Sequence, residues 1–334
     1  MQDFVTLTLD GNTMIQNAFF LFPGQGAQYP GMALDLLESG NEAIKRLFSL
    51  ASELMGKDMA ALIGNSTPEA LTPTDIAQPA ITLANLAAAV YLAEKGIKAS
   101  GTAGFSLGEY SALAIAGIIS EEDCLSLVIQ RGKSMQAAID HIKQNDPRPP
   151  GMAAVIGLAP EQVEALINEW KNSGLTGLNP ANINSPKQVA VSGSADALEE
   201  AEKRFKEAGA RRFMRLAVAG PYHSPFMKSA AEEFDITLEK VTFNDPVIPF
   251  FSNVTGKQVQ SGKEAKLLAH RHILEGVRWT DEEAALAQLQ PKLLLEVGPG
   301  KVLQGLWKDT GSSIPCYTAG TVAEINELAK MEEQ

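Results

Sequence analysis

The strongest candidate for chemistry in this chain is a serine inside a glycine-bounded motif. Residues Gly104–Gly108 have the sequence Gly-Phe-Ser-Leu-Gly, which matches the pattern G-x-S-x-G. In this pattern a tight turn between a strand and a helix lifts the serine hydroxyl clear of the sheet, and the glycines allow that turn. A pattern with three fixed positions also occurs by chance, so the flanking segments have to support it. With that support, Ser106 is the predicted nucleophile.

A serine hydroxyl is a weak nucleophile near neutral pH and needs a neighbouring base. Of the four histidines, His223 lies in a predicted loop between small residues, and we expect it to be the general base. His141 is expected to be exposed. His270 and His272 are two positions apart in a helical pattern, so they point to different faces and do not predict a metal site. No Asp or Glu stands out as the group that orients the imidazole, and a backbone carbonyl is the alternative.

Two backbone amides are candidates for holding a developing oxyanion. The amide of Leu107 directly follows the nucleophile, which is the usual position of the first donor. The second donor must come from another loop, and we expect it to be the amide of Gln25 in the glycine-containing segment 23–28. A plain structural turn is the alternative for this segment. A phosphate-binding loop is disfavoured, because neither G-x-G-x-x-G nor a P-loop pattern is present.

Arg131 is a further candidate and lies in a predicted amphipathic helix. An arginine in such a helix is usually a solvated surface charge. The alternative is a fork that binds a substrate carboxylate, because the planar guanidinium group matches a carboxylate with two parallel hydrogen bonds. The residue pattern alone leaves both interpretations open.

The segments around these residues alternate between strands and helices. An order of this kind is typical of a parallel sheet covered by helices, so the predicted fold class is α/β. The predicted strands are 18–22, 97–105, 247–251 and 292–297, and the predicted helices are 41–54, 74–95, 107–119 and 121–139.

A proline-rich break at 143–151 interrupts this alternation, because Pro147, Pro149 and Pro150 cannot continue a helix. The predicted order after the break is β-α-β-β-α-β, which is that of a ferredoxin-like unit. We therefore predict a discontinuous large domain, residues 1–148 and 219–334, with a small subdomain inserted at 149–218. The predicted elements of the subdomain are 152–156, 160–171, 177–183, 188–192, 195–208 and 212–218.

Composition disfavours several classes of function. The chain has 334 residues, of which 45% are hydrophobic, and its formal net charge is −12. Such an acidic chain is a poor general binder of nucleic acid or anionic membranes, because phosphate groups need clustered Lys and Arg. No apolar run approaches the roughly 20 residues that span a bilayer, and segment 1–12 lacks the basic region of a signal peptide. Residues 1–13 are an additional strand, an artificial extension or an upstream start.

The two cysteines, Cys124 and Cys316, are too few for a disulfide scaffold and do not form a metal-binding pair. A reducing cytoplasm is therefore the simplest setting for the protein. We expect no cofactor, no metal and a monomer.

The chain resembles the malonyl-CoA:acyl carrier protein transacylase family over nearly its whole length, from Ala18 to Trp307. The resemblance implies an α/β-hydrolase-like large domain with a parallel sheet and an inserted ferredoxin-like subdomain. It lies in the order of the motifs as well as in their content. The matching motifs are 22–28, 104–111, 131–135, 182–186, the turn around His223, 252–256 and 296–303.

The resemblance also implies a two-step acyl transfer. Ser106 attacks the thioester of malonyl-CoA while His223 takes its proton, and the amides of Gln25 and Leu107 hold the oxyanion. The phosphopantetheine thiol of acyl carrier protein then resolves the malonyl-serine ester. Arg131 pairs with the free malonyl carboxylate, which gives a preference for malonyl over acetyl because acetyl leaves a buried arginine unpaired.

Further roles rest on the resemblance alone. The main-chain carbonyl of His272 orients the base, at a position where the family commonly has Gln. Asn182 and Asn184 lie near the subdomain interface, with ordinary loop hydrogen bonding as the alternative. Gln78 lines the pocket. Phe105 stands where the family often has His, which removes a possible polar group near the site.

The predicted partners are malonyl-CoA and an acyl carrier protein, which is typically acidic. A basic face of the subdomain is the predicted docking site, with a solvated helix face as the alternative. It consists of Lys203, Arg204, Lys206, Arg211, Arg212 and Arg215. Three other functions compete: a serine acyl hydrolase or thioesterase, a malonyltransferase serving a polyketide synthase or malonate decarboxylase, and a non-enzymatic adaptor, which would not need an intact nucleophile, base and donor loop.

Overall fold

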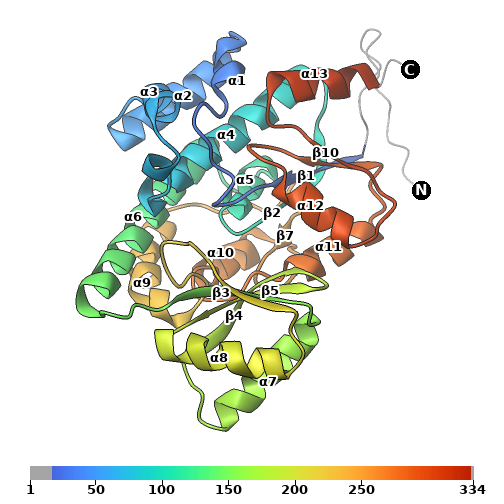
Figure 1. The fold of residues 1–334 in the computed structure, drawn as a ribbon. Helices are drawn as coiled ribbons and strands as arrows, with labels where there is room; N and C mark the ends of the chain where they lie inside the picture. Colours follow the sequence, from blue (N-terminus) through green and yellow to red (C-terminus); the bar gives the residue numbers. More distant parts are fainter. Residues whose placement is uncertain (1–16, 332–334) are drawn as a thin grey trace.

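A parallel sheet forms the centre of the larger part of the molecule (Figure 1). The structure is a computed structural model that describes residues 17–331, so the role of residues 1–13 lies outside it. The strands follow the spatial order β10-β9-β1-β2, and every neighbouring pair is parallel. The predicted α/β class with a parallel sheet is confirmed. Their bounds are β1 (Ala18–Phe22), β2 (Ala99–Gly104), β9 (Leu293–Glu296) and β10 (Cys316–Thr318).

Helices cover both faces of this sheet, which explains why the side chains of β1 are all buried. Phe20 and Phe22 pack into the core formed with α4, α5 and α6, whereas Phe19 and Leu21 pack on the opposite face against α11 and α12. The bounds of the helices on the two faces are α4 (Thr74–Glu94), α5 (Gly108–Ile115), α6 (Glu121–Asn145), α11 (Trp279–Gln288) and α12 (Val302–Asp309).

The remaining elements of this part lie around the sheet and its helices (Figure 1). They are α1 (Leu34–Glu38), α2 (Glu42–Met55), α3 (Met59–Asn65), η1 (Glu69–Leu71), η2 (Pro225–Met227), α9 (Lys228–Leu238), α10 (Gly262–Arg271), α13 (Val322–Met331) and the short antiparallel pair β7 (Phe251–Ser252) and β8 (Lys257–Gln258).

Helix α4 is long and apolar enough to cross a membrane by length and composition alone. The expectation that no segment approaches that length was therefore wrong. Most of the helix is buried, and it packs along α6 in the core. Its apolar composition is accounted for by this central position, since a helix that is apolar all round needs partners on every side.

A second sheet lies below the first in Figure 1 and is antiparallel. Its strands follow the order β4-β5-β3-β6, and α7 and α8 cover the side that faces away from the rest of the molecule. These elements have an apolar core of their own, which includes Val155, Trp170 and Phe205. Their bounds are β3 (Gly151–Ile156), α7 (Pro160–Asn172), β4 (Leu178–Ser185), β5 (Gln188–Gly193), α8 (Ala195–Glu207) and β6 (Arg212–Arg215).

Backbone hydrogen bonds join β4, an edge strand of the small sheet, to the segment that precedes α11. The Ile183 N–H donates to the Val277 carbonyl over 2.8 Å, and the Val277 N–H donates to the Ala181 carbonyl over 2.8 Å. Val277 lies just before α11, in a segment that belongs to the larger part of the molecule. The small sheet is therefore attached to the large one through main-chain contacts as well as through its connecting segments.

Several predicted segments differ from the structure. Helix α5 ends at Ile115 instead of 119, and strand β6 ends at Arg215 instead of 218. Helix α6 runs to Asn145 instead of ending at 139, because only Pro147 and its neighbours stop a helix and the residues before Asp146 remain free to extend it. The strand expected at 247–251 is reduced to β7, and Phe250 joins the parallel sheet only through an isolated bridge to Thr102. Val247 is exposed, so the apolar pattern there does not reflect burial.

Candidate active site

A cavity of about 240 Å³ lies between the carboxyl ends of β1 and β2 and the small sheet. Its walls include Ser106, Arg131 and His223 from the larger part, and Asn182 and Asn184 from β4. The carboxyl edge of a parallel sheet is where α/β proteins generally bind ligands. The structure thus brings most of the predicted site residues to one cavity.

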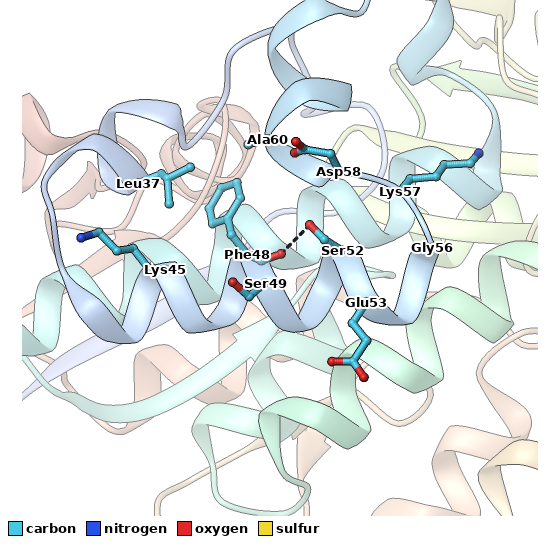
Figure 2. A pocket seen from close by; sticks show the side chains of 10 residues that line it. All are labelled: Leu37, Lys45, Phe48, Ser49, Ser52, Glu53, Gly56, Lys57, Asp58 and Ala60. Atoms are coloured by element: carbon cyan, nitrogen blue, oxygen red, sulfur yellow. Dashed lines mark hydrogen bonds between the residues drawn. The ribbon is translucent and has the colours of Figure 1, made fainter.

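A larger hollow of about 730 Å³ lies on the outer side of α2 and α3 (Figure 2). Its serines include Ser52, whose hydroxyl donates to the Phe48 carbonyl over 2.7 Å and accepts from the Met59 N–H over 3.0 Å, so it joins the end of α2 to the start of α3. Lys45 and Lys57 lie toward opposite ends of the hollow in this view. Because no histidine lines this hollow beside a serine, we place the active site in the smaller cavity.

The turn that carries Ser106 has the tight geometry expected of its motif. Ser106 has φ +50°, in the left-handed region that non-glycine residues rarely adopt. A Cβ on Gly104 would lie 2.1 Å from the Gly108 carbonyl oxygen, and a Cβ on Gly108 would lie 2.0 Å from the Phe22 carbonyl oxygen. Both motif glycines are therefore required by close backbone packing between β2, α5 and β1.

Ser106 and His223 form a hydrogen-bonded pair. The Ser106 Oγ and His223 Nε2 atoms are 2.8 Å apart. His223 Nδ1 faces two main-chain carbonyls, those of His272 and Glu275, each at 3.0 Å. Because a carbonyl only accepts, the ring hydrogen lies on Nδ1 and the lone pair on Nε2 faces the serine hydroxyl. The Glu275 carbonyl was not foreseen, since a main-chain group carries no signal in the residue pattern.

The surroundings keep this imidazole neutral. Burial lowers the pKa of His223 to about 4, and the positive charge of Arg131 acts in the same direction. His223 is 4% exposed and has φ +52°, so it too is held in a conformation that is rare for a non-glycine residue. A neutral imidazole aimed at a hydroxyl can accept its proton.

One predicted amide donor lies in the nucleophile's turn, and the other lies in a loop that packs against this turn. Leu107 precedes α5, and the loop of Gln25 packs against the turn so closely that a Cβ on Gly24 would lie 2.3 Å from the Phe105 carbonyl oxygen. Within residues 17–331, neither the Leu107 nor the Gln25 amide donates a hydrogen bond. The Ser106 amide, in contrast, is taken by the side chain of Asn253.

Arg131 is buried in the wall of the cavity, where it is 1% exposed. Its guanidinium carbon lies 5.4 Å from the centre of the Tyr110 ring. Its Nε and Nη2 atoms are buried and have no hydrogen-bond partner among the described residues. Burial lowers the pKa of Arg131. A buried cation with unmet donors is costly to keep, and an anionic ligand group would satisfy it.

The remaining expected residues divide into two groups. Asn182 and Asn184 line the cavity, as does Phe105, whose ring packs edge-on against Trp279 with centroids 5.4 Å apart. Gln78 does not line it: its side chain is buried within the core and donates to the Met135 sulfur over 3.4 Å. The side chain at this position packs between α4 and α6, so the structure gives it no direct access to a ligand.

A buried polar network beneath the turn was missed by the sequence analysis. The main-chain N–H of Asn253 donates to Glu109 over 2.6 Å, and the side-chain amide of Asn253 donates to Glu282 over 2.8 Å. Burial raises the pKa of Glu109 to about 8 and raises that of Glu282 well above its usual range, so burial favours the protonated form of both carboxyl groups. The available signal was the polar pair Ser252-Asn253 placed directly after an apolar segment.

The basic face predicted for docking is partly neutralised within the chain. Its α8 members each contact a glutamate of the same helix: Lys203 and Arg204 contact Glu200 at 3.6 and 2.9 Å, and Lys206 contacts Glu202 at 2.6 Å. Its other members are Arg211, which directly precedes β6, and Arg212 and Arg215 of β6; all three are exposed, and none forms an ion pair with a described residue. The described part of the chain holds no group of three metal-ligating side chains.

The chain has known relatives over nearly its whole length. Residues 19–331 match the acyl transferase domain family. The malonyl CoA-acyl carrier protein transacylase of Haemophilus influenzae is 38% identical over 311 residues, which are 92% of this chain and 96% of the relative. An acyl carrier protein S-malonyltransferase structure from Vibrio cholerae has 35% identity and a TM-score of 0.85, and covers 94% of this chain and 100% of the other.

A further structure contains a malonyl-transacylase in complex with its holo acyl-carrier protein from a type II PKS. It has 34% identity and a TM-score of 0.85, and the match covers 95% of this chain and 100% of the other. Similarity of this extent, together with a serine and a histidine paired at the carboxyl edge of the sheet, shows that the chain belongs to the malonyl CoA-acyl carrier protein transacylase family.

Proposed function

We propose that this chain transfers the malonyl group from malonyl-CoA to the phosphopantetheine thiol of an acyl carrier protein, through a malonyl ester on Ser106, in fatty acid biosynthesis. One observation carries the proposal: the Ser106–His223 pair shares a cavity with a buried arginine whose donors are unmet. The pair supplies a nucleophile and its base. The arginine would form hydrogen bonds and an ion pair with a carboxylate on the acyl group.

In the first step Ser106 Oγ attacks the thioester carbonyl carbon while its proton moves to His223 Nε2. The carbonyl oxygen becomes negatively charged, and the amides of Leu107 and Gln25 are the donors placed to stabilise it. The C–S bond then breaks, coenzyme A leaves with the proton from His223, and the malonyl group remains esterified to Ser106. A neutral His223 favours this step because it can accept the proton at physiological pH.

In the second step His223 takes the proton of the carrier's thiol, and the sulfur attacks the ester carbonyl. The C–O bond breaks, the proton returns to Ser106 Oγ, and the malonyl thioester leaves on the carrier. Arg131 pairs with the free carboxylate through both steps. Because acetyl would leave the arginine unpaired, the site prefers malonyl, and Asn182 and Asn184 contribute polar contacts from β4.

The predicted domain organisation is part of this proposal. We assign residues 1–148 and 219–334 to an α/β-hydrolase-like catalytic domain, and residues 149–218 to a ferredoxin-like subdomain inserted into it. The separate core of the small sheet, its β-α-β-β-α-β element order and its β4-β5-β3-β6 strand order support the assignment. Both cysteines are free, which fits the proposed reducing cytoplasm, and we propose a monomer.

An acidic carrier protein would dock on the basic face of the small subdomain. The exposed Arg211, Arg212 and Arg215 support this, since β6 leads directly into residues 216–219 at the cavity wall. Lys203, Arg204 and Lys206 are a weaker part of this proposal, because their charges are already paired along α8.

Intact-mass measurement after brief exposure to malonyl-CoA tests the function. We expect one malonyl adduct on the wild-type protein and none on Ser106→Ala, because the ester needs the hydroxyl. The adduct should disappear when phosphopantetheinylated carrier protein is added, with malonyl recovered on the carrier. Rapid hydrolysis of malonyl-CoA without an adduct would instead indicate a hydrolase.

A second candidate differs only in the acceptor. The malonyl-transacylase structure bound to a type II PKS acyl-carrier protein shares 34% identity with this chain, which makes a polyketide carrier the alternative acceptor. Comparing the rates of malonyl transfer to a fatty-acid carrier and to a polyketide carrier distinguishes the two. A higher kcat/KM for the polyketide carrier would redirect the proposal.

A further inference from the structure

The imidazole of His272 has no part in the chemistry proposed above, although the main-chain carbonyl of the same residue holds the base. His272 directly follows α10, and it is 1% exposed. Its ring centre lies 5.5 Å from that of His223 and 6.0 Å from that of Tyr110. A polar ring is thus buried next to the Ser106–His223 pair. Burying a polar group costs free energy unless the group is hydrogen-bonded.

The ring is bonded to the side chain that holds the nucleophile's turn. Asn253 Oδ1 accepts from the Ser106 N–H over 2.6 Å and lies 3.1 Å from His272 Nε2. Asn253 Nδ2 donates to the Gly104 carbonyl over 2.7 Å and to Glu282 Oε1 over 2.8 Å. If the Asn253 side-chain amide were flipped, its NH₂ group would face the Ser106 N–H and its oxygen would face the Gly104 carbonyl oxygen. Neither contact is a hydrogen bond, so the orientation of the amide is fixed.

This orientation also fixes the tautomer of His272. Since Asn253 Oδ1 can only accept, His272 Nε2 must carry the hydrogen. Burial lowers the pKa of His272 well below its usual range, and the positive charge of Arg131 acts in the same direction, so the ring is neutral. Nδ1 then has no hydrogen, and it has no partner among the described residues.

We propose that the His272 side chain is a positioning residue for the acyl transfer, acting on Ser106 through Asn253. One residue then fixes both reacting groups: its carbonyl holds the His223 ring, and its imidazole holds the amide that anchors the Ser106 turn. Both Ser106 and His223 have positive φ values, +50° and +52°. Residues in that region relax unless their surroundings hold them, so a common anchor keeps the hydroxyl and the imidazole aligned.

The test compares three substitutions at this position, and it rests on the proposed function. His272→Leu and His272→Phe keep the main-chain carbonyl and fill the space, but they remove the donor to Asn253. His272→Gln keeps an N–H donor at similar reach. His270→Leu is the matched control, because His270 is two residues away, is more exposed, and contacts Asp235 outside the cavity.

We expect His272→Leu and His272→Phe to lower kcat for malonyl transfer on the order of 10- to 100-fold, because small misplacement of reacting groups has effects of this size. The KM for malonyl-CoA should change less than about twofold, since Arg131 and the cavity wall are untouched. His272→Gln should recover most of kcat, and His270→Leu should keep the wild-type kcat.

A wild-type kcat in both donor-free variants would overturn the proposal, as would a His272→Gln variant as slow as they are. If one donor-free variant does not fold, the other replaces it, and the rate of malonyl loading is measured per folded molecule. In an Asn253→Ala background, His272→Leu should add no further loss of kcat, whereas a full additional loss would rule out the route through Asn253.

Malonyl loading of the wild-type protein, measured in the same samples, separates this inference from the function on which it rests. Absence of loading in the wild type would reject the proposed function. Normal loading in the wild type together with unimpaired donor-free variants would reject only the positioning role of His272.

Discussion

The proposed function involves cations in two places, one buried in the cavity wall and the others on the surface of α8, and they differ in almost every physical respect. Arg131 is buried in the cavity wall with two nitrogen atoms unpartnered among the described residues. Lys203, Arg204 and Lys206 lie on α8 in contact with neighbouring glutamates. The sequence shows only positive charge in both places. Burial and unmet hydrogen bonds, rather than charge, are what mark a position that needs a ligand.

Replacing Arg131 tests the buried side of this comparison and should have the largest effect. In Arg131→Ala we expect the preference for malonyl-CoA over acetyl-CoA to fall by about 100-fold or more, because hydrogen bonds to charged groups contribute about 1.5–3 kcal/mol each. The measurement is the ratio of the two kcat/KM values. Lys133→Ala is the matched control, since it removes an exposed cation from the same helix.

Equal loading of the wild-type protein by acetyl-CoA and malonyl-CoA would contradict the role of Arg131. The same conclusion would follow if Lys133→Ala lost as much selectivity as Arg131→Ala. Arg131→Lys sharpens the result, because a lysine keeps the charge but not the planar two-donor geometry. We expect it to recover only part of the selectivity.

The pH dependence of acyl-serine formation probes the same cation through its effect on the base. The pKa of His223 is lowered to about 4, mainly by burial and further by Arg131, so the wild type should keep its loading rate down to near that pH. Removing a nearby positive charge makes the imidazolium form easier to reach, which raises the pKa of His223. The acidic limb of the Arg131→Ala profile should therefore move to higher pH, measured as loading rate between pH 4 and 8.

An acidic limb that stays in place in Arg131→Ala would show that the arginine does not act on His223. The Lys133→Ala profile provides the reference, because its exposed charge is screened by solvent. A shift of equal size in that control would indicate a general effect of net charge.

Reversing the charges on α8 should have the smallest effect. In the triple variant with Glu at 203, 204 and 206, we expect the KM for the carrier protein to rise by only about two- to fivefold, because these surface cations are already paired. The KM for malonyl-CoA should not change. A variant with Glu at 45, 57 and 330, which are exposed lysines on α2, after α2 and on α13, has the same change in net charge.

A rise in carrier KM that is equal in both triple variants would remove α8 from the proposed docking face. A rise of more than tenfold in the α8 variant alone would show the opposite, that paired surface cations carry much of the recognition. Either result would change the contrast between the buried Arg131 and the surface cations of α8.

The sequence was sufficient for the nucleophile's turn because its geometry depends on residue types. Gly104 and Gly108 occupy positions where a Cβ would collide with backbone atoms, so the two glycines of the motif indicate close backbone packing. The same holds for strand β1, whose apolar run matches burial on both faces of the sheet. His223 was found from its loop context, and the structure places it 2.8 Å from Ser106.

The parts that were missed depend on which groups meet in space. The carbonyl of Glu275 is a main-chain group, and any residue could supply it. Gln78 was expected at the pocket, but the direction in which a helical side chain points depends on how α4 packs against α6. Glu109 is one position of a motif in the sequence, whereas its raised pKa results from complete burial beside Asn253.

The main-chain link between β4 and Val277 has a mechanical consequence. The carbonyls of His272 and Glu275, which hold the imidazole, lie within five residues of this link along the chain. Any outward movement of the small sheet would therefore pull on residues 272–277, whose carbonyls hold the imidazole. The position of the small sheet and the alignment of the base are coupled through this segment.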